Sequence, residues 1–293
     1  MDAGANVVHI RRMTFEDRLD GWTRGARGPW LAALVALLAA LPGWFAMPVL
    51  DRDEARFAQA SAQMLETRDF TSIHFQAEPR FKKPVGIYWL QAAATALVSS
   101  PEARDIRSYR IPSLLGAALA AAALAWGAAA VTRPGHAFLA GGLLATTLLL
   151  STEGFIAKTD AALCGLVTLS MAALLRIYLA SRGQGPPAGR TVVVLFWVGV
   201  AGSILIKGPI GPMVVALTLA ALCLWDRRAR WLGALRWDWG LLGVVAAVGP
   251  WALAITVATD GGFWGTAIGG DLAPKLAGGQ EGHGAPFGYY TLL

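Results

Sequence analysis

The chain has 293 residues, of which 55% are hydrophobic and only 15% charged, and its mean hydropathy is +0.50. Water-soluble domains carry about 25% charged residues, so this composition excludes a soluble domain, a disordered chain and a small disulfide scaffold, and predicts an all-α polytopic membrane protein. The net charge of +6 does not predict a nucleic-acid partner, because membrane proteins keep Lys and Arg on the cytoplasmic side for topological reasons.

The N-terminal 29 residues precede the first apolar run and are rich in arginine. They contain Arg11, Arg12, Arg18, Arg24 and Arg27. The run 30–50 that follows carries no charge and ends at Pro48-Val49-Leu50 without a small-residue cleavage site. We therefore expect a signal-anchor helix that stays attached, with segment 1–29 in the cytoplasm.

Six further apolar runs follow, separated by short charged or Gly/Pro-bearing connections. They cover about 111–131, 137–151, 161–180, 191–206, 210–225 and 239–257. A membrane helix needs about 20 apolar residues, so with the first run this pattern predicts about seven transmembrane helices.

The run 85–100 is apolar but short, and its placement decides the topology. If it does not cross the membrane, the arginine-bearing connections 132–136, 181–190 and 226–238 share the side of the N-terminus, which is the positive-inside pattern. We favour this arrangement. It predicts that the loop 51–110 and the other polar clusters all face the non-cytoplasmic side.

The loop after the first span opens with Asp51-Arg52-Asp53-Glu54, and residues 54–66 have the apolar spacing of an amphipathic helix on the membrane surface. Two interpretations of Asp53 stay open. It is either an N-cap of this helix or a general base toward an acceptor hydroxyl, and a capping bond would be compatible with the second role.

Three other clusters place charges beside apolar runs. Lys82 and Lys83 precede Tyr88-Trp89; they either snorkel at the interface or bind a lipid-linked phosphate. Asp160 begins one apolar run and is either the cap of that helix or a residue of the functional site. Lys207 lies between two apolar runs with no other charge nearby, which favours a functional role. His283 and Tyr289 lie in the Gly-rich C-terminal tail, and His283 has no companion ligands at metal-site spacing, so zinc is not predicted.

Taken in chain order, several short motifs resemble one family. They are Asp53-Glu54-x-Arg56-Phe57, Phe81-x-Lys83-Pro84 with Tyr88-Trp89, Arg110-Ile111-Pro112-Ser113, Thr159-Asp160, Lys207-Gly208-Pro209, Pro250-Trp251 and His283-x-x-Pro286. The set is similar to polyprenyl-phosphate-sugar-dependent glycosyltransferases of the GT-C superfamily, in the aminoarabinose transferase and protein mannosyltransferase branch.

The resemblance implies a bacterial inner-membrane enzyme that moves a sugar from a polyprenyl phosphate to a lipid A, polysaccharide or protein acceptor in the periplasm. It implies catalytic roles for Asp53, Glu54 and Asp160. It implies further positions around the same cavity, with donor-phosphate binding centred on Lys83, and these are Lys82, Lys83, Arg56, Lys207, His283 and Tyr289.

Lys82 stands where the aminoarabinose branch tends to carry Glu. A metal site that uses this Glu is therefore in doubt, and no metal ligand is assigned, although a divalent ion could still assist. The extra cation suggests a more anionic donor or acceptor.

The resulting division is a cytoplasmic segment 1–29, a transmembrane GT-C-like module 30–257 that includes the outer loop 51–110, and a second outer loop with the start of a further helix at 258–293. We expect the chain to be truncated, because the family usually continues with more spans and a soluble domain.

Two alternatives stay open, a transporter or lipid flippase and an inactive remnant that only binds lipid-linked sugar. Polar clusters on one side and no visible internal repeat count against the transporter.

Overall fold

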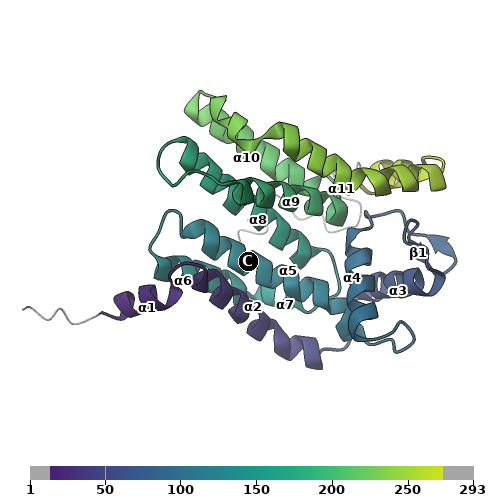
Figure 1. Ribbon diagram of the computed structural model, residues 1–293. Helices are drawn as coiled ribbons and strands as arrows, with labels where there is room; N and C mark the ends of the chain where they lie inside the picture. The colour runs from purple at the N-terminus through teal and green to yellow at the C-terminus, as the bar shows by residue number, and fades with distance from the viewer. Residues whose placement is uncertain (1–13, 50, 273–293) are drawn as a thin grey trace, which may run out of the picture.

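A computed structural model describes residues 14–49 and 51–272, and these residues form helices, the connections between them and one small hairpin (Figure 1). The elements in chain order are α1 (Phe15–Thr23), α2 (Arg27–Ala46), α3 (Arg52–Thr67), β1 (His74–Phe75), β2 (Glu78–Pro79), α4 (Gly86–Val98), α5 (Ile106–Ala128), α6 (Pro134–Ala145), α7 (Leu148–Gly154), α8 (Asp160–Ser181), α9 (Arg190–Lys207), α10 (Ile210–Asp226), η1 (Arg230–Leu235), α11 (Trp237–Ala258), α12 (Gly262–Trp264) and η2 (Gly265–Leu272). The predicted all-α membrane fold is confirmed.

Five helices are long and apolar enough to cross a membrane, namely α2, α5, α8, α9 and α11. Their outward faces carry large apolar side chains: Leu38 of α2 is 56% exposed, and Val245 and Leu253 of α11 are 64% and 68% exposed. So much apolar surface is unfavourable in water, and lipid chains would cover it.

The expected count of about seven spans is not confirmed by the helix lengths. The run predicted at 137–151 forms α6 and α7, which are bent by 66° at the break between them. The described part of the chain therefore has five candidate spans, or six if α6 and α7 count as one broken span. The run at 210–225 forms α10, which has 17 residues, the lower end of the usual spanning length, and it is not among the five long helices.

Helix α5 lies at the centre of the bundle and packs against α2, α6 and α8. Its contact with α8 is close because both helices present glycine there. A Cβ added to Gly116 would lie 2.5 Å from backbone atoms of Ala162, and one added to Gly165 would lie 2.5 Å from the carbonyl oxygen of Gly116. Small residues at this crossing therefore let two membrane helices approach at backbone distance.

The loop between α2 and α5 folds into a cap at one end of the bundle, built from α3, the β1–β2 hairpin and α4 (Figure 1). Helix α4 has 13 residues, or roughly 20 Å at 1.5 Å per residue, which is short of the roughly 30 Å apolar core of a bilayer. Segment 85–100 is thus too short as a helix to cross, as the favoured topology requires.

A buried apolar cluster joins this cap to the bundle. Phe57 of α3 and Tyr88 of α4 pack in one cluster with Ile206 of α9 and Trp251 of α11, and the Trp251 indole N–H donates to the carbonyl oxygen of Thr71 at 3.2 Å. The amphipathic helix expected at 54–66 is confirmed as α3, and its apolar face packs against protein.

Helix α1 was not anticipated and lies at the opposite end of the bundle (Figure 1). Arg133, in the connection between α5 and α6, forms ion pairs with Glu16, Asp17 and Asp20 of this helix at 2.6 to 3.4 Å. These contacts dock the N-terminal segment against the loop that carries Arg133.

Candidate active site

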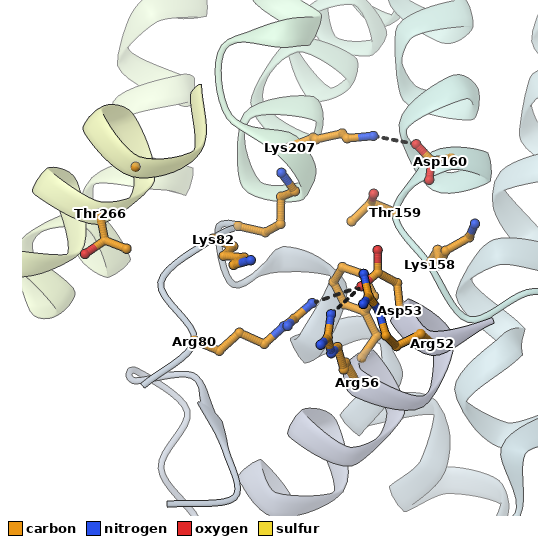
Figure 2. Close-up of a pocket in the computed structure, with 13 residues that line it drawn as sticks. Arg52, Asp53, Arg56, Arg80, Lys82, Lys158, Thr159, Asp160, Lys207 and Thr266 are labelled. Carbon is orange, nitrogen blue, oxygen red and sulfur yellow. Dashed lines mark hydrogen bonds and ion pairs between the residues drawn. The ribbon is translucent and has the colours of Figure 1, made fainter. Parts of the chain in front are cut away.

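A polar cavity of about 650 Å³ opens where the cap meets the ends of α8 and α9 (Figure 2). The residues around it come from the cap, from the loop before α8, from the end of α9 and from η2. They are Arg52, Asp53, Arg56, Phe57, Arg80, Lys82, Lys83, Lys158, Thr159, Asp160, Lys207, Thr266 and Gly270. The cavity brings together segments that are more than 200 residues apart.

The lining contains seven cations and two carboxylates. Such a surplus of positive charge in a partly enclosed space attracts an anionic ligand, and Lys and Arg are the usual partners of phosphate groups. Of the seven predicted site residues that the structure describes, all but Glu54 are in this lining: Asp53, Arg56, Lys82, Lys83, Asp160 and Lys207.

Asp53 lies in the first turn of α3, with its side chain 53% exposed at the cavity. The interpretation of Asp53 as the N-cap is wrong, because Asp51 is the cap: the Asp51 carboxylate accepts from the backbone N–H of Asp53 at 2.6 Å and of Glu54 at 3.4 Å. Asp51 thereby satisfies the helix start and leaves the Asp53 carboxylate available to the cavity.

Two arginines hold the Asp53 carboxylate. Arg56, one turn along α3, lies 3.4 Å from it, and Arg80 lies 4.0 Å from it (Figure 2). The first contact is the one expected from the helical spacing. Arg80 was missed in the sequence, because only the folded loop brings it back over α3.

Arg80 is fixed from two sides and only 9% of its side chain is exposed. Its guanidinium lies 5.2 Å from the centre of the Phe57 ring, and its Nε donates to the Tyr88 hydroxyl at 3.2 Å. Burial raises the pKa of Tyr88 to about 12, so the phenol stays neutral and accepts this bond at ordinary pH.

Asp160 and Lys207 form an ion pair across the cavity (Figure 2). Asp160 begins α8 and Lys207 ends α9. Gly208 has a φ of +66°, a conformation that glycine adopts without steric cost, and it turns the chain into α10. The turn at Lys207-Gly208-Pro209 therefore places the Lys207 side chain beside Asp160, the first residue of α8.

Lys158 also lines the cavity, and no local pattern of residues predicts this. Its Nζ lies 2.9 Å from the Asp51 carboxylate and 3.4 Å from that of Glu153. Burial by itself would raise the pKa of Asp51, but the hydrogen bonds from Lys158 and the α3 backbone lower it below its ordinary value. Burial would lower the pKa of Lys158, but its bonds to the two carboxylates raise it.

The pH dependence of stability should report the pair of Asp51 and Lys158. Since the folded pKa of Asp51 is below its unfolded value of about 3.9, the contribution of the pair is complete above about pH 4 and is lost as pH falls through the folded pKa. The difference in thermal unfolding midpoint between the wild type and Lys158→Met should therefore be larger at pH 7 than near pH 3, where both carboxylates that pair with Lys158 take up protons. A difference that is unchanged at the lowest pH would contradict this.

Glu54, predicted to act beside Asp53, does not line the cavity. Its buried carboxylate accepts from Nε and Nη2 of Arg110 at 2.8 and 3.1 Å and from the backbone N–H of Ala157 at 2.9 Å. Arg110 also donates to the carbonyl oxygen of Met47 at 2.8 Å. We therefore assign Glu54 to holding α3, α5, the end of α2 and the loop of Lys158 together, rather than to contact with substrate.

The remaining predicted cavity residues, His283 and Tyr289, lie outside the described residues. Within 14–49 and 51–272, no group of three His, Cys, Asp or Glu side chains is placed to hold a metal ion.

Residues 82–253, more than half of the chain, match the sequence model of the family described as dolichyl-phosphate-mannose-protein mannosyltransferase. Among curated proteins, the undecaprenyl phosphate-alpha-4-amino-4-deoxy-L-arabinose arabinosyl transferase of Aeromonas salmonicida is 27% identical over 266 residues, 89% of this chain and 46% of its own length. The protein of the same name from Pseudomonas aeruginosa strain UCBPP-PA14 is 30% identical over 249 residues, 82% of this chain and 42% of its own.

The fold is similar to that of ArnT from Cupriavidus metallidurans. The apo crystal structure aligns with a TM-score of 0.71 at 22% identity and the structure bound to undecaprenyl phosphate with 0.62 at 21%, each covering 81% of this chain and 43% of the other. The chain thus spans less than half the length of the relatives it matches.

Proposed function

The chain belongs to the dolichyl-phosphate-mannose-protein mannosyltransferase family, and we propose that it carries the donor site of a GT-C membrane glycosyltransferase. The reaction moves a sugar from a polyprenyl phosphate to a hydroxyl of a lipid A, polysaccharide or protein acceptor. The single observation that carries this proposal is the cavity at the end of the membrane helices, where a carboxylate lies among seven cations. The name of the curated relatives supports undecaprenyl phosphate as the class of carrier.

Asp53 acts as the general base in this mechanism. Its carboxylate takes the proton of the acceptor hydroxyl while that oxygen forms a bond to the anomeric carbon of the sugar. The bond from that carbon to the phosphate oxygen breaks in the same step, its electron pair leaves with the polyprenyl phosphate, and the anomeric configuration inverts. The exposed face of Asp53 and its contacts with Arg56 and Arg80 support this role.

The cations stabilise the departing phosphate, because a phosphate leaving group needs charge neutralisation more than protonation. Lys83 is the principal phosphate ligand, with Lys82, Arg56 and Lys207 beside it around the cavity. The ion pair with Asp160 orients Lys207 before the donor binds. Glu54 serves this site by positioning, through Arg110, the segments that carry Asp53 and Lys158.

The proposed topology puts the N-terminus in the cytoplasm and the cavity on the periplasmic side. The arginines in the connections 132–136, 181–190 and 226–238 support it, since they lie at the end of the bundle opposite the cap. The cap and its cavity would then face the periplasm, where polymer and lipid acceptors are found.

Transfer from radiolabelled polyprenyl-phosphate sugars, with the native polypeptide in membranes, tests the donor site. Lys83→Gln should lower the rate of polyprenyl-phosphate release by about 100-fold, because one preorganised partner of the developing phosphate charge is removed. Arg68→Gln is the matched control, since Arg68 is exposed on the same cap and does not line the cavity. Equal rates for Lys83→Gln and the wild type would contradict the assignment, and no release by the wild type from any donor would favour a transporter or a binding protein.

A further inference from the structure

A second cavity, of about 530 Å³, lies at the other end of α8 from the candidate active site. Helix α8 begins at Asp160, which lines the first cavity, and ends at Ser181, which lines the second. Its 22 residues span roughly 33 Å at 1.5 Å per residue, about the thickness of the apolar core of a bilayer. The two cavities therefore lie about one membrane thickness apart.

The second cavity has an ordered base formed by α8 and α10. The Tyr178 hydroxyl donates to the Asp226 carboxylate at 2.9 Å, and Nη1 of Arg182 donates both to that hydroxyl and to Asp226. Asp226 is thereby fully engaged with partners of this chain. The network holds Arg182 at the edge of the cavity without a rearrangement when a ligand binds.

Positive charge at the opening is not compensated in the same way. Arg228 lines the cavity, and Arg227 and Arg230 flank it; all three are exposed, and none forms an ion pair with a carboxylate in the described part of the chain. The aromatic wall is Trp231, whose indole N–H is buried without a hydrogen-bond acceptor among those residues. Two guanidiniums, those of Arg182 and Arg228, around one cavity are complementary to a phosphate group.

The surroundings of the cavity are typical of the level where lipid headgroups meet acyl chains. Leu224 and Trp225, just before the arginines, are 79% and 86% exposed, and the next helix, α11, starts with Trp237 and Trp239, 38% and 68% exposed. Tryptophans at helix ends are typical of the membrane–water interface. A ligand whose phosphate enters the cavity would thus have its acyl chains beside apolar side chains.

We propose that this second cavity binds the phosphate of an anionic phospholipid in the leaflet opposite the candidate active site. The inference is independent of the proposed glycosyl transfer. Arg228 and Arg182 contact the phosphate, the Trp231 ring forms one wall of its site, and Leu224 and Trp225 contact the acyl chains. A free phosphate compound would satisfy the arginines but would leave this apolar surface unused, so the structure favours a lipid.

The test is lipid binding to the delipidated, detergent-purified chain, measured by native mass spectrometry and by the shift in thermal unfolding midpoint. Dioleoylphosphatidylglycerol should bind saturably and stabilise the wild type, whereas dioleoylphosphatidylcholine should not. Arg228→Gln should weaken phosphatidylglycerol binding roughly fivefold, the amount that one arginine near an anionic headgroup contributes. The network variant Tyr178→Phe should leave Arg182 less well held and give a smaller loss.

Arg190→Gln is the matched control, because Arg190 is exposed at the same end of the bundle but does not line the cavity. It should bind like the wild type. Equal losses of phosphatidylglycerol affinity in Arg228→Gln and Arg190→Gln, or equal binding of the two lipids, would overturn the proposal. The arginines would then serve only to set the orientation of the chain in the membrane. Equally tight binding of soluble glycerophosphoglycerol would overturn the lipid assignment in favour of a free phosphate compound.

Discussion

Replacing Asp53 by asparagine is expected to lower sugar transfer by about 100- to 10,000-fold, the range that a positioned general base contributes. The substitution keeps the shape of the side chain and its place in the first turn of α3, but the amide does not accept the acceptor proton. Asp53 is 53% exposed at the cavity, and the helix start is capped by Asp51, so we expect the variant to fold. The measurement is release of labelled polyprenyl phosphate with acceptor present.

Glu78→Gln is the control for this experiment. Glu78 is an exposed carboxylate in β2 of the same cap and does not line the cavity, so its loss should leave the rate unchanged. Donor binding should also survive in Asp53→Asn, because the cations that hold the phosphate remain. A variant that transfers sugar at the wild-type rate would remove Asp53 from the mechanism, and one that no longer binds donor would make it a binding residue.

The second large effect is expected from Arg110→Met, which should destabilise the fold by about 3–5 kcal/mol, the cost of breaking a buried ion pair by removing one partner. Arg110 is 1% exposed, and Glu54 is equally buried. The variant leaves the Glu54 charge without its guanidinium and the carbonyl oxygen of Met47 without a donor. The free energy of unfolding in detergent, from a denaturant titration, measures the loss.

Arg107→Met is the matched control on the same helix. The side chain of Arg107 is 49% exposed and pairs with Asp105 at 2.9 Å, and an exposed pair of this kind contributes about 0–1 kcal/mol. If both variants lost the same stability, the network around Glu54 would not hold the cap. If Arg110→Met kept wild-type transfer as well as stability, its positioning role would be wrong.

The two acidic neighbours on α3 show where prediction from sequence stops. Asp53 and Glu54 are adjacent, and the resemblance implied a catalytic role for both. Successive residues on a helix are rotated by about 100°, so one carboxylate faces the cavity while the next faces the core. Which of them faces which way depends on Arg110, 56 residues away along the chain.

The cationic lining shows the same limit. Lys82, Lys83 and Lys207 could be predicted because each stands beside an apolar run in a local pattern. Arg80 and Lys158 could not, since their roles come from contacts with Asp53 and Asp51, which lie far from them in sequence. The break between α6 and α7 was also missed. It falls at Thr146-Thr147, where the Thr147 side chain caps the start of α7, and two hydroxyls within an apolar run are a weaker signal than a charge or a proline.

The sequence by itself determined that this is a helical membrane protein with an apolar helix over 30–50, an amphipathic helix in the loop that follows it and charged clusters between its apolar runs. Those properties follow from local composition and from the 3.6-residue period of the helix, which need no long-range information. Only the tertiary structure decided which charges share a cavity and that a second basic cavity lies about one membrane thickness away. Both cavities are lined by side chains from several helices, which small residues allow to pack closely. The pairing of those helices cannot be predicted from the local sequence of any one of them.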